Sequence, residues 1–118
     1  MSDAMIKRLK ASKKQADDHD NKYGYAAGEQ WAEYRAEYKE LEALSVIEGD
    51  LDLYDRESDS GWMLAVQVGK YLECNDISDI AILKETMLGD ASTHFTESYV
   101  EGFVEGALAK YREVADKI

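Results

Sequence analysis

The residues with the greatest chemical reactivity in this chain are one cysteine and two histidines, and they lie far apart in the sequence. A nucleophilic thiol needs an adjacent base, but Cys74 has no histidine near it, so we expect an inert, buried or half-buried thiol. His19 lies in an aspartate-rich stretch and is expected to be solvated. His94 and Glu97 form one His-x-x-Glu pair, whereas a di-iron bundle needs carboxylates and histidines from several helices. We therefore predict no catalytic residue and no enzyme.

The stretch 48–61 is rich in carboxylates, which raises the possibility of calcium binding. An EF-hand loop needs glycine at its sixth position and glutamate at its twelfth. Counting from Asp50 or from Asp55, the sixth residue is Asp55 or Ser60 and the twelfth is Gly61 or Val66. Neither frame fits, and the sequence contains no phosphate-binding P-loop and no Gly-x-Gly-x-x-Gly. We predict no metal and no cofactor, and interpret the stretch as a solvated loop that caps the next helix.

The composition favours a small helical protein. The chain has 118 residues and no proline, although about 5% is usual, and proline is excluded from helix interiors because it lacks an N–H group. A single cysteine excludes an internal disulfide. The N-terminal segment lacks the apolar core of a signal peptide, and no apolar run reaches the ~18 residues of a membrane span. We therefore expect a cytoplasmic protein without a membrane segment.

The charge is unevenly distributed. Fourteen basic and 25 acidic residues give a formal net charge of -11. Residues 1–22 carry six basic and four acidic residues, so this segment is weakly basic and the remainder is strongly acidic. Phosphates would be repelled by such a body, which argues against direct nucleic-acid binding. The charge favours a protein partner with a basic surface, although solubility alone also accounts for it.

The apolar spacing predicts an all-α protein, a compact bundle of four to five helices. A helix over about 22–40 is predicted from apolar residues repeating every three or four positions: Tyr23, Ala27, Trp31, Tyr34, Tyr38 and Leu41. Further helices are predicted over about 61–73, 79–88 and 92–117, with a strand over 63–68 as the main alternative to the first of these. The expected N-caps are Asp59 or Ser60, Ser78, and Ser92 or Asp90, and Gly89 is expected to end the third of the four.

Residues 1–21 are predicted to form a weakly basic arm outside a single acidic domain over 22–118. The apolar residues of the arm larger than alanine are confined to its first nine positions, too few to anchor it. It is therefore expected to be either a mobile terminus or a helix continuous with the next one. A solvated terminus is a simpler interpretation than contact with a membrane surface or with nucleic acid.

Two predicted helices carry the same Gly-aromatic-x-x-Gly pattern, at Gly24 and Gly28 and again at Gly102 and Gly106. Each glycine in a helix interior costs about 1 kcal/mol relative to alanine, so close backbone approach is the expected reason for it. The i,i+4 spacing places both glycines of a pair on one face. We predict that the two long helices cross at these segments within one chain. The alternatives are a symmetric dimer contact and a ligand held against the bare backbone.

These features favour a non-enzymatic protein–protein interaction module, such as a regulator, an inhibitor or an accessory factor of the kind that phages and mobile elements encode. The alternatives are a nucleic-acid mimic that blocks a DNA- or RNA-binding protein, and an enzyme or ligand-binding protein whose pocket the sequence does not reveal. A mimic would use two glutamate rows, at 29, 33 and 37 and at 97, 101 and 105, together with the 48–59 loop. The chain is expected to be a monomer or a homodimer. The candidate interaction surface consists of acidic loop residues and tyrosines: Glu48, Asp50, Asp52, Asp55, Glu57, Asp59, Tyr25, Tyr38 and Tyr54.

Overall fold

The computed structural model describes residues 2–74 and 76–118, and every regular element in these two ranges is helical. The predicted bundle of four to five helices is confirmed, and the alternative strand over 63–68 is wrong because that run lies inside α3. The elements are α1 (Asp3–Tyr34), α2 (Tyr38–Ile47), η1 (Glu48–Asp50), α3 (Ser60–Tyr71), α4 (Ile77–Leu88), α5 (Glu97–Val114) and η2 (Ala115–Lys117).

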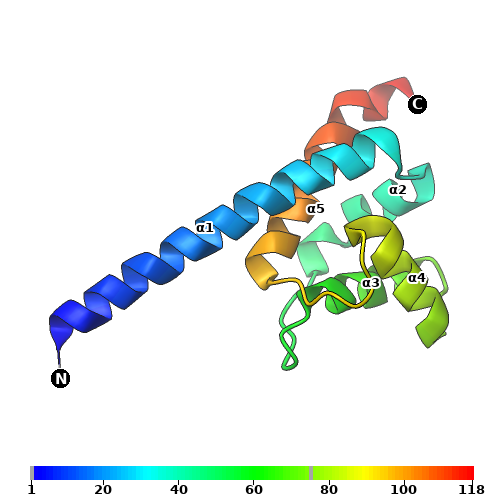
Figure 1. Cartoon of the computed structure of the whole chain (residues 1–118). Helices are drawn as coiled ribbons and strands as arrows, with labels where there is room; N and C mark the ends of the chain where they lie inside the picture. Colours follow the sequence, from blue (N-terminus) through cyan, green and yellow to red (C-terminus); the bar gives the residue numbers. More distant parts are fainter. Residues whose placement is uncertain (1, 75) are drawn as a thin grey trace.

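Helix α1 has 32 residues, which corresponds to a length of roughly 48 Å. Its start is capped by the Ser2 side chain, which accepts a hydrogen bond from the Met5 N–H. Figure 1 shows the N-terminal part of α1 projecting from the molecule, while the other helices gather around its C-terminal half. The N-terminal arm is therefore helical and continuous with the following helix.

The predicted helix over 22–40 ends earlier than expected, at Tyr34. A new helix, α2, begins at Tyr38 with a capping box, in which the Glu40 carboxylate accepts a hydrogen bond from the Glu37 N–H at 2.8 Å. Such reciprocal bonds between the cap and the third helical position satisfy backbone groups that a helix start leaves free. Glu37, the last member of the glutamate row at 29, 33 and 37, is thus the N-cap of α2.

The buried face of α1 also differs from the predicted aromatic row. Tyr23 and Tyr34 are 61% and 75% exposed, and the residues of α1 that are buried are Gly24, Gly28 and Trp31. The glycines face inward because α5 packs directly against them, and the Trp31 ring stacks on Phe103 with 5.3 Å between ring centroids.

The backbones of α1 and α5 meet at the four glycines, as predicted. A Cβ atom added to Gly24 or Gly28 would overlap the backbone of α5 at Tyr99 or Phe103, and one added to Gly102 or Gly106 would overlap α1 at Asn21 or Tyr25. The crossing is thus formed inside one chain, and the glycine grooves are filled. The dimer and ligand alternatives for these grooves are therefore wrong.

The central element of the core is α5, whose other face packs toward α2 and α3. Its apolar residues alternate with exposed glutamates, as a helix with one buried face requires. The helix begins after Thr96, which caps the Tyr99 N–H, and not at Ser92 or Asp90. These two residues form a turn in which Asp90 accepts hydrogen bonds from Ser92 and Thr93. The same bonds lower the pKa of Asp90 to about 2.

The ends of α3 and α4 agree in most respects with those predicted from the sequence. Asp59 caps α3 as expected, and Gly89 ends α4 in the left-handed conformation with φ +90°. The cap of α4 is Asp76 and not Ser78, whose N–H donates to the Asp76 side chain at 2.8 Å. Large side chains buried at this end of the bundle come from α2, α3 and α4: Leu44, Leu64, Val68 and Met87.

Candidate interaction site

An acidic groove lies between α5 and the segment that follows α2. One wall is a row of glutamates at i, i+4 and i+8 on the exposed face of α5: Glu97, Glu101 and Glu105. The opposite side carries Glu48 and Asp52, and the apolar residues that complete the lining are Leu51, Leu53 and Val104. The groove has a volume of about 310 Å³. Five carboxylates thus surround an apolar floor in one strongly acidic hollow.

The carboxylates of the groove influence one another's protonation. The pKa of Glu101 is raised, first because burial penalises its charge and then because Glu97, Glu105 and Asp17 lie near it. Burial and the neighbouring negative charges therefore both disfavour the charge of Glu101, a cost that a bound cation would relieve. The groove is therefore electrostatically prepared for positively charged groups.

Contacts from α3 and α5 hold the acidic segment in place beside α5. Gln67 of α3 donates to the Asp52 carbonyl at 2.7 Å and accepts from the Asp52 N–H at 2.9 Å. Arg112 of α5 donates to Glu48 at 2.6 Å, so one carboxylate of the groove already has a basic neighbour. These contacts anchor both ends of 48–52, which makes the groove a preformed feature.

The predicted acidic surface is divided by the structure into exposed and internal residues. Asp50 and Glu57 are exposed outside the groove. Asp55 is half-buried and accepts hydrogen bonds from the backbone N–H groups of Glu57 and Asp59. Asp59 is buried, so its assignment to an exposed surface is wrong: it holds helices together.

None of the three candidate tyrosines lines the groove. Tyr54 is 65% exposed and Tyr38 is 52% exposed, and Tyr38 lies beside Tyr111 with 6.3 Å between ring centroids. The Glu42 carboxylate and the Tyr111 hydroxyl raise the pKa of Tyr38 to about 12. Tyr25 is half-buried against Gly106, which contradicts its selection as an exposed contact.

The second glutamate row that a nucleic-acid mimic would use is not part of the groove. Glu33 lies 3.7 Å from the Lys110 ammonium, and Glu37 belongs to the capping box of α2. Neither residue lines the groove, and neither does Glu29. The glutamate row of α5 therefore lines the groove together with the acidic segment, whereas the row at 29, 33 and 37 lies outside it.

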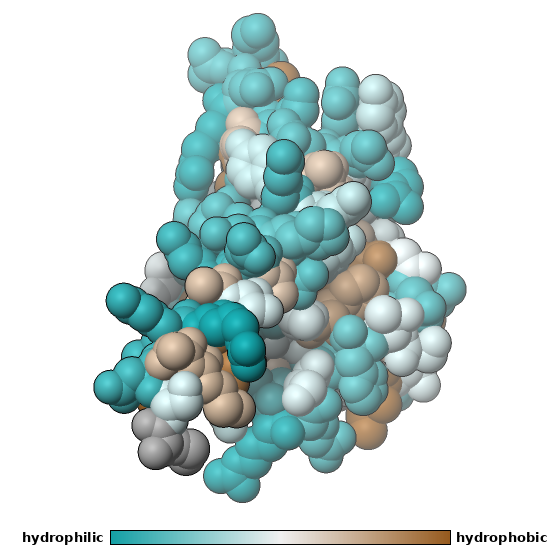
Figure 2. Space-filling view, turned by 60° about the vertical axis from the view of Figure 1, so that its left-hand side comes forward, coloured by the Kyte–Doolittle hydropathy of each residue, from teal (hydrophilic) through white to brown (hydrophobic). Residues whose placement is uncertain are grey.

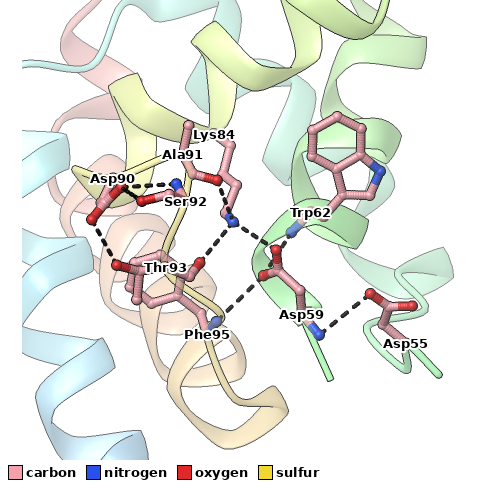
Figure 3. Close-up of polar contacts among 9 residues, drawn as sticks. All are labelled: Asp55, Asp59, Trp62, Lys84, Asp90, Ala91, Ser92, Thr93 and Phe95. Carbon is pink, nitrogen blue, oxygen red and sulfur yellow. Dashed lines mark hydrogen bonds and ion pairs between the residues drawn. The ribbon is translucent and has the colours of Figure 1, made fainter. Parts of the chain in front are cut away.

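A buried ion pair that the sequence did not reveal connects the start of α3 to α4 (Figure 3). The Lys84 ammonium, 1% exposed, donates to Asp59 Oδ2 at 2.6 Å. It also donates to the carbonyl oxygens of Ala91 and Thr93 at 2.9 Å and 2.7 Å. All three bonds of the ammonium are thus made within the protein, and they tie the α4–α5 loop to α3.

Asp59 completes this cluster from the other side. Its Oδ1 accepts hydrogen bonds from the backbone N–H groups of Trp62 and Phe95, both at 3.3 Å. Burial works against the charge of Asp59, but the bond from Lys84 and those from Phe95 and Trp62 outweigh it and lower the pKa of this carboxyl. Because every polar contact here is internal, the cluster has a structural role.

In the part of the chain that the structure describes, the cysteine and the two histidines do not come together in a metal-binding group. His19 lies beside Tyr23 with 4.6 Å between ring centroids and the rings tilted by 53°, and half-buried Cys74 contacts the Leu72 carbonyl. Within 2–74 and 76–118, the structure has no group of three metal-binding side chains. In the same ranges, no helix combines the length and apolar character needed to cross a bilayer. Comparisons of the chain with protein-family models, with curated proteins and with solved structures gave no match.

Proposed function

We propose that this protein is a non-enzymatic interaction module of the cytoplasm that binds a basic segment of a partner protein in the acidic groove. The observation that carries the proposal is the combination of five carboxylates with an apolar floor in one preformed groove. Lysine and arginine fit such a surface because their aliphatic stems pack on apolar groups while their charged ends meet carboxylates.

The geometry favours a segment with several positive charges. Three glutamates at successive i+4 positions extend over roughly 12 Å along α5. The carboxylates lie in a row and not around one point, so a single small cation would leave most of them unpaired. An extended or helical segment with lysines or arginines one turn apart matches the row. Binding of this kind regulates, blocks or recruits the partner without chemistry.

The test uses two variants with the same change of charge. The groove variant is Glu97→Gln, Glu101→Gln and Glu105→Gln, and the control neutralises exposed acids elsewhere: Glu57→Gln, Glu85→Gln and Asp116→Asn. Both are compared with the wild type in binding to a peptide library in which arginine and lysine positions vary. The proposal requires selected peptides to lose at least tenfold in affinity with the groove variant only. Equal losses in the two variants would show a non-specific charge effect and refute it.

A nucleic-acid mimic is the second candidate, supported by the regular glutamate row of α5. A mimic needs charge alone, whereas a bound basic segment also uses the apolar floor. Leu51→Ser, at a half-buried position, therefore separates the two. Binding that is insensitive to this change, is lost steeply with salt and is displaced by duplex DNA would favour the mimic.

A further inference from the structure

The outer face of α1 carries a row of residues at heptad spacing that is exposed to solvent and includes three large apolar side chains, Met5, Leu9 and Tyr23. Its residues recur with alternating spacings of four and three: Met5, Leu9, Ser12, Ala16, His19, Tyr23 and Ala26. All seven are exposed, and the large ones are 46% (Met5), 50% (Leu9) and 61% (Tyr23) exposed. Such a seam is the pattern by which two helices pair side by side.

This seam lies away from the face of α1 that packs on α5. Gly24, Gly28 and Trp31 face the bundle, whereas Tyr23 and Ala26 face outward. The seam starts on the projecting arm and continues onto the part of α1 that the bundle supports (Figure 1). Figure 2, which brings the N-terminal end of α1 forward, shows apolar side chains at that end among hydrophilic ones.

The charges beside the seam identify what covers it. The flanking positions carry basic residues on the arm, Arg8 and Lys13, and acidic residues further along, Asp20 and Glu29. Lys13 also pairs with Asp17 at 2.9 Å and Asp20 accepts a hydrogen bond from Thr96 at 3.0 Å, so Arg8 and Glu29 carry most of the charge argument. When two identical helices pair in antiparallel fashion about a two-fold axis, each residue of one copy faces a residue of the other copy. Within one row, the two residue numbers of every facing pair have the same sum. With Leu9 opposite Ala26 of a second copy, Arg8 lies opposite Glu29 and Lys13 opposite Asp20. Each pair occurs twice because of the two-fold symmetry.

The same register also pairs the apolar flanking residues. Ile6, which is 47% exposed, lies opposite half-buried Ala27 of the second copy. A shift of one heptad, which places Leu9 opposite His19, brings Arg8 against Lys22 and Lys13 against its own equivalent. Like charges in these positions destabilise a helix pair. One register is therefore favoured by the charge pattern.

We infer that the outer face of α1 is the contact surface of an antiparallel homodimer, in which the arm of each copy packs along the supported half of α1 in the other. The residues of this contact are neither the glycines of the crossing nor residues that line the acidic groove. The contact therefore stands independently of the proposed function. The partner is a second copy of this chain because one antiparallel register places Arg8 of the arm against Glu29 of the supported half and brings no like charges together at the flanks.

The dimer is tested first by sedimentation equilibrium on the full chain, from low micromolar to near-millimolar concentration. A reversible monomer–dimer equilibrium is expected, and a monomer throughout would overturn the inference. Arg8→Glu should weaken the dimer roughly tenfold, since it replaces two attractive pairs by two repulsive ones. Lys7→Glu, an equal change of charge one position away from the flank, should leave the dimer nearly unchanged. Equal weakening by both variants would contradict the register.

Two further measurements examine the pairing directly. The double variant Arg8→Glu, Glu29→Arg should recover the dimer, with circular dichroism confirming that the variant is folded. In a Cys74→Ala background, chains carrying Ser12→Cys and chains carrying Tyr23→Cys should form a disulfide on mixing, because these positions face each other. Cross-linking of Ser12→Cys to Ala16→Cys instead would reveal the shifted register and overturn the inference.

Discussion

The glycine crossing makes a strong prediction, because alanine at Gly28 should destabilise the protein despite its higher helix propensity. At an unconstrained position in a helix, Gly→Ala stabilises by about 1 kcal/mol. At Gly28 the new Cβ would lie 2.8 Å from the Phe103 carbonyl carbon and 2.9 Å from the Ala107 nitrogen, and would overlap the Phe103 oxygen. These atoms belong to a helix backbone, which no rotamer change can move away.

The cost follows from the separation that alanine imposes. Normal contact needs about 3.5–4 Å, so α1 and α5 must move apart by roughly 1 Å. Such a gap forfeits up to half of the dispersion energy between facing atoms, and overpacking typically costs about 1–3 kcal/mol in addition. After subtracting the gain in propensity, we expect a net loss of about 3 kcal/mol. A domain of 118 residues has a total stability of roughly 6–18 kcal/mol, so the loss is a large fraction of it.

Thermal and urea unfolding, followed by the fluorescence of buried Trp31 and by circular dichroism, measure this effect. The melting temperature of Gly28→Ala should fall by about 10–15 °C. The control is Gly49→Ala, where an added Cβ meets nothing within 4 Å, and it should change stability by less than about 0.5 kcal/mol. A Gly28→Ala protein as stable as the wild type would show that the backbones are not in contact and would refute the reasoning.

Three further predictions concern buried or clustered charges. Lys84→Met should destabilise by about 3–5 kcal/mol, because it leaves the Asp59 charge buried without its ammonium partner, and adding Asp59→Asn should recover part of the loss in chemical unfolding. Because the pKa of Asp59 is lowered, its charge contributes stability above the ordinary carboxyl pKa of about 4, and this contribution is lost as the pH falls through the folded-state pKa. Asp59→Asn should therefore make stability depend less on pH in the acidic range. Glu101 has the opposite sign: its raised pKa implies a cost that appears as the pH rises through that value, so Glu101→Gln should increase the melting temperature at neutral pH and not at pH values well below 4.

The features predictable from the sequence are those that leave a local signature. Helix-interior glycines are costly, so the repeated pattern at Gly24 and Gly102 is enough to predict a backbone contact. The cap at Asp59 and the helix end at Gly89 are likewise predictable from residue type and position. In each case the physical cause lies within a few residues of the signal.

The errors occur where tertiary contacts override a local pattern. The aromatic row on α1 predicts the wrong buried face because aromatic residues offer more apolar area than glycine, although the closest packing needs the smallest residues. The end of α1 at Tyr34 has no proline or glycine near it, and its only local sign is the pairing of Glu37 with Glu40. Lys84 gives no signal of its burial because lysine is usually exposed, and its partner lies 25 positions away.

The acidic groove is beyond sequence reasoning for a similar reason. Its walls come from segments about 50 residues apart, and only their packing shows which acidic residues face a common space. The two glutamate rows look equivalent in the sequence, but Glu33 and Glu37 are occupied by contacts with Lys110 and with the start of α2. Charge composition thus favours the kind of partner proposed, and only the fold shows which acidic residues share one groove.

The projecting part of α1 is helical because it extends a helix that has already been nucleated. Isolated helices shorter than ~12–15 residues are marginal because nucleation is costly, whereas adding residues to an existing helix is not. The supported half of α1 supplies the nucleus through its contact with α5, and the arm extends it with a cap at Ser2 and an exposed Lys13–Asp17 pair at 2.9 Å. In a monomer the arm should therefore fray from its first turn. A second copy would protect the amides of that turn, and amide exchange at increasing concentration would separate a free arm from a paired one.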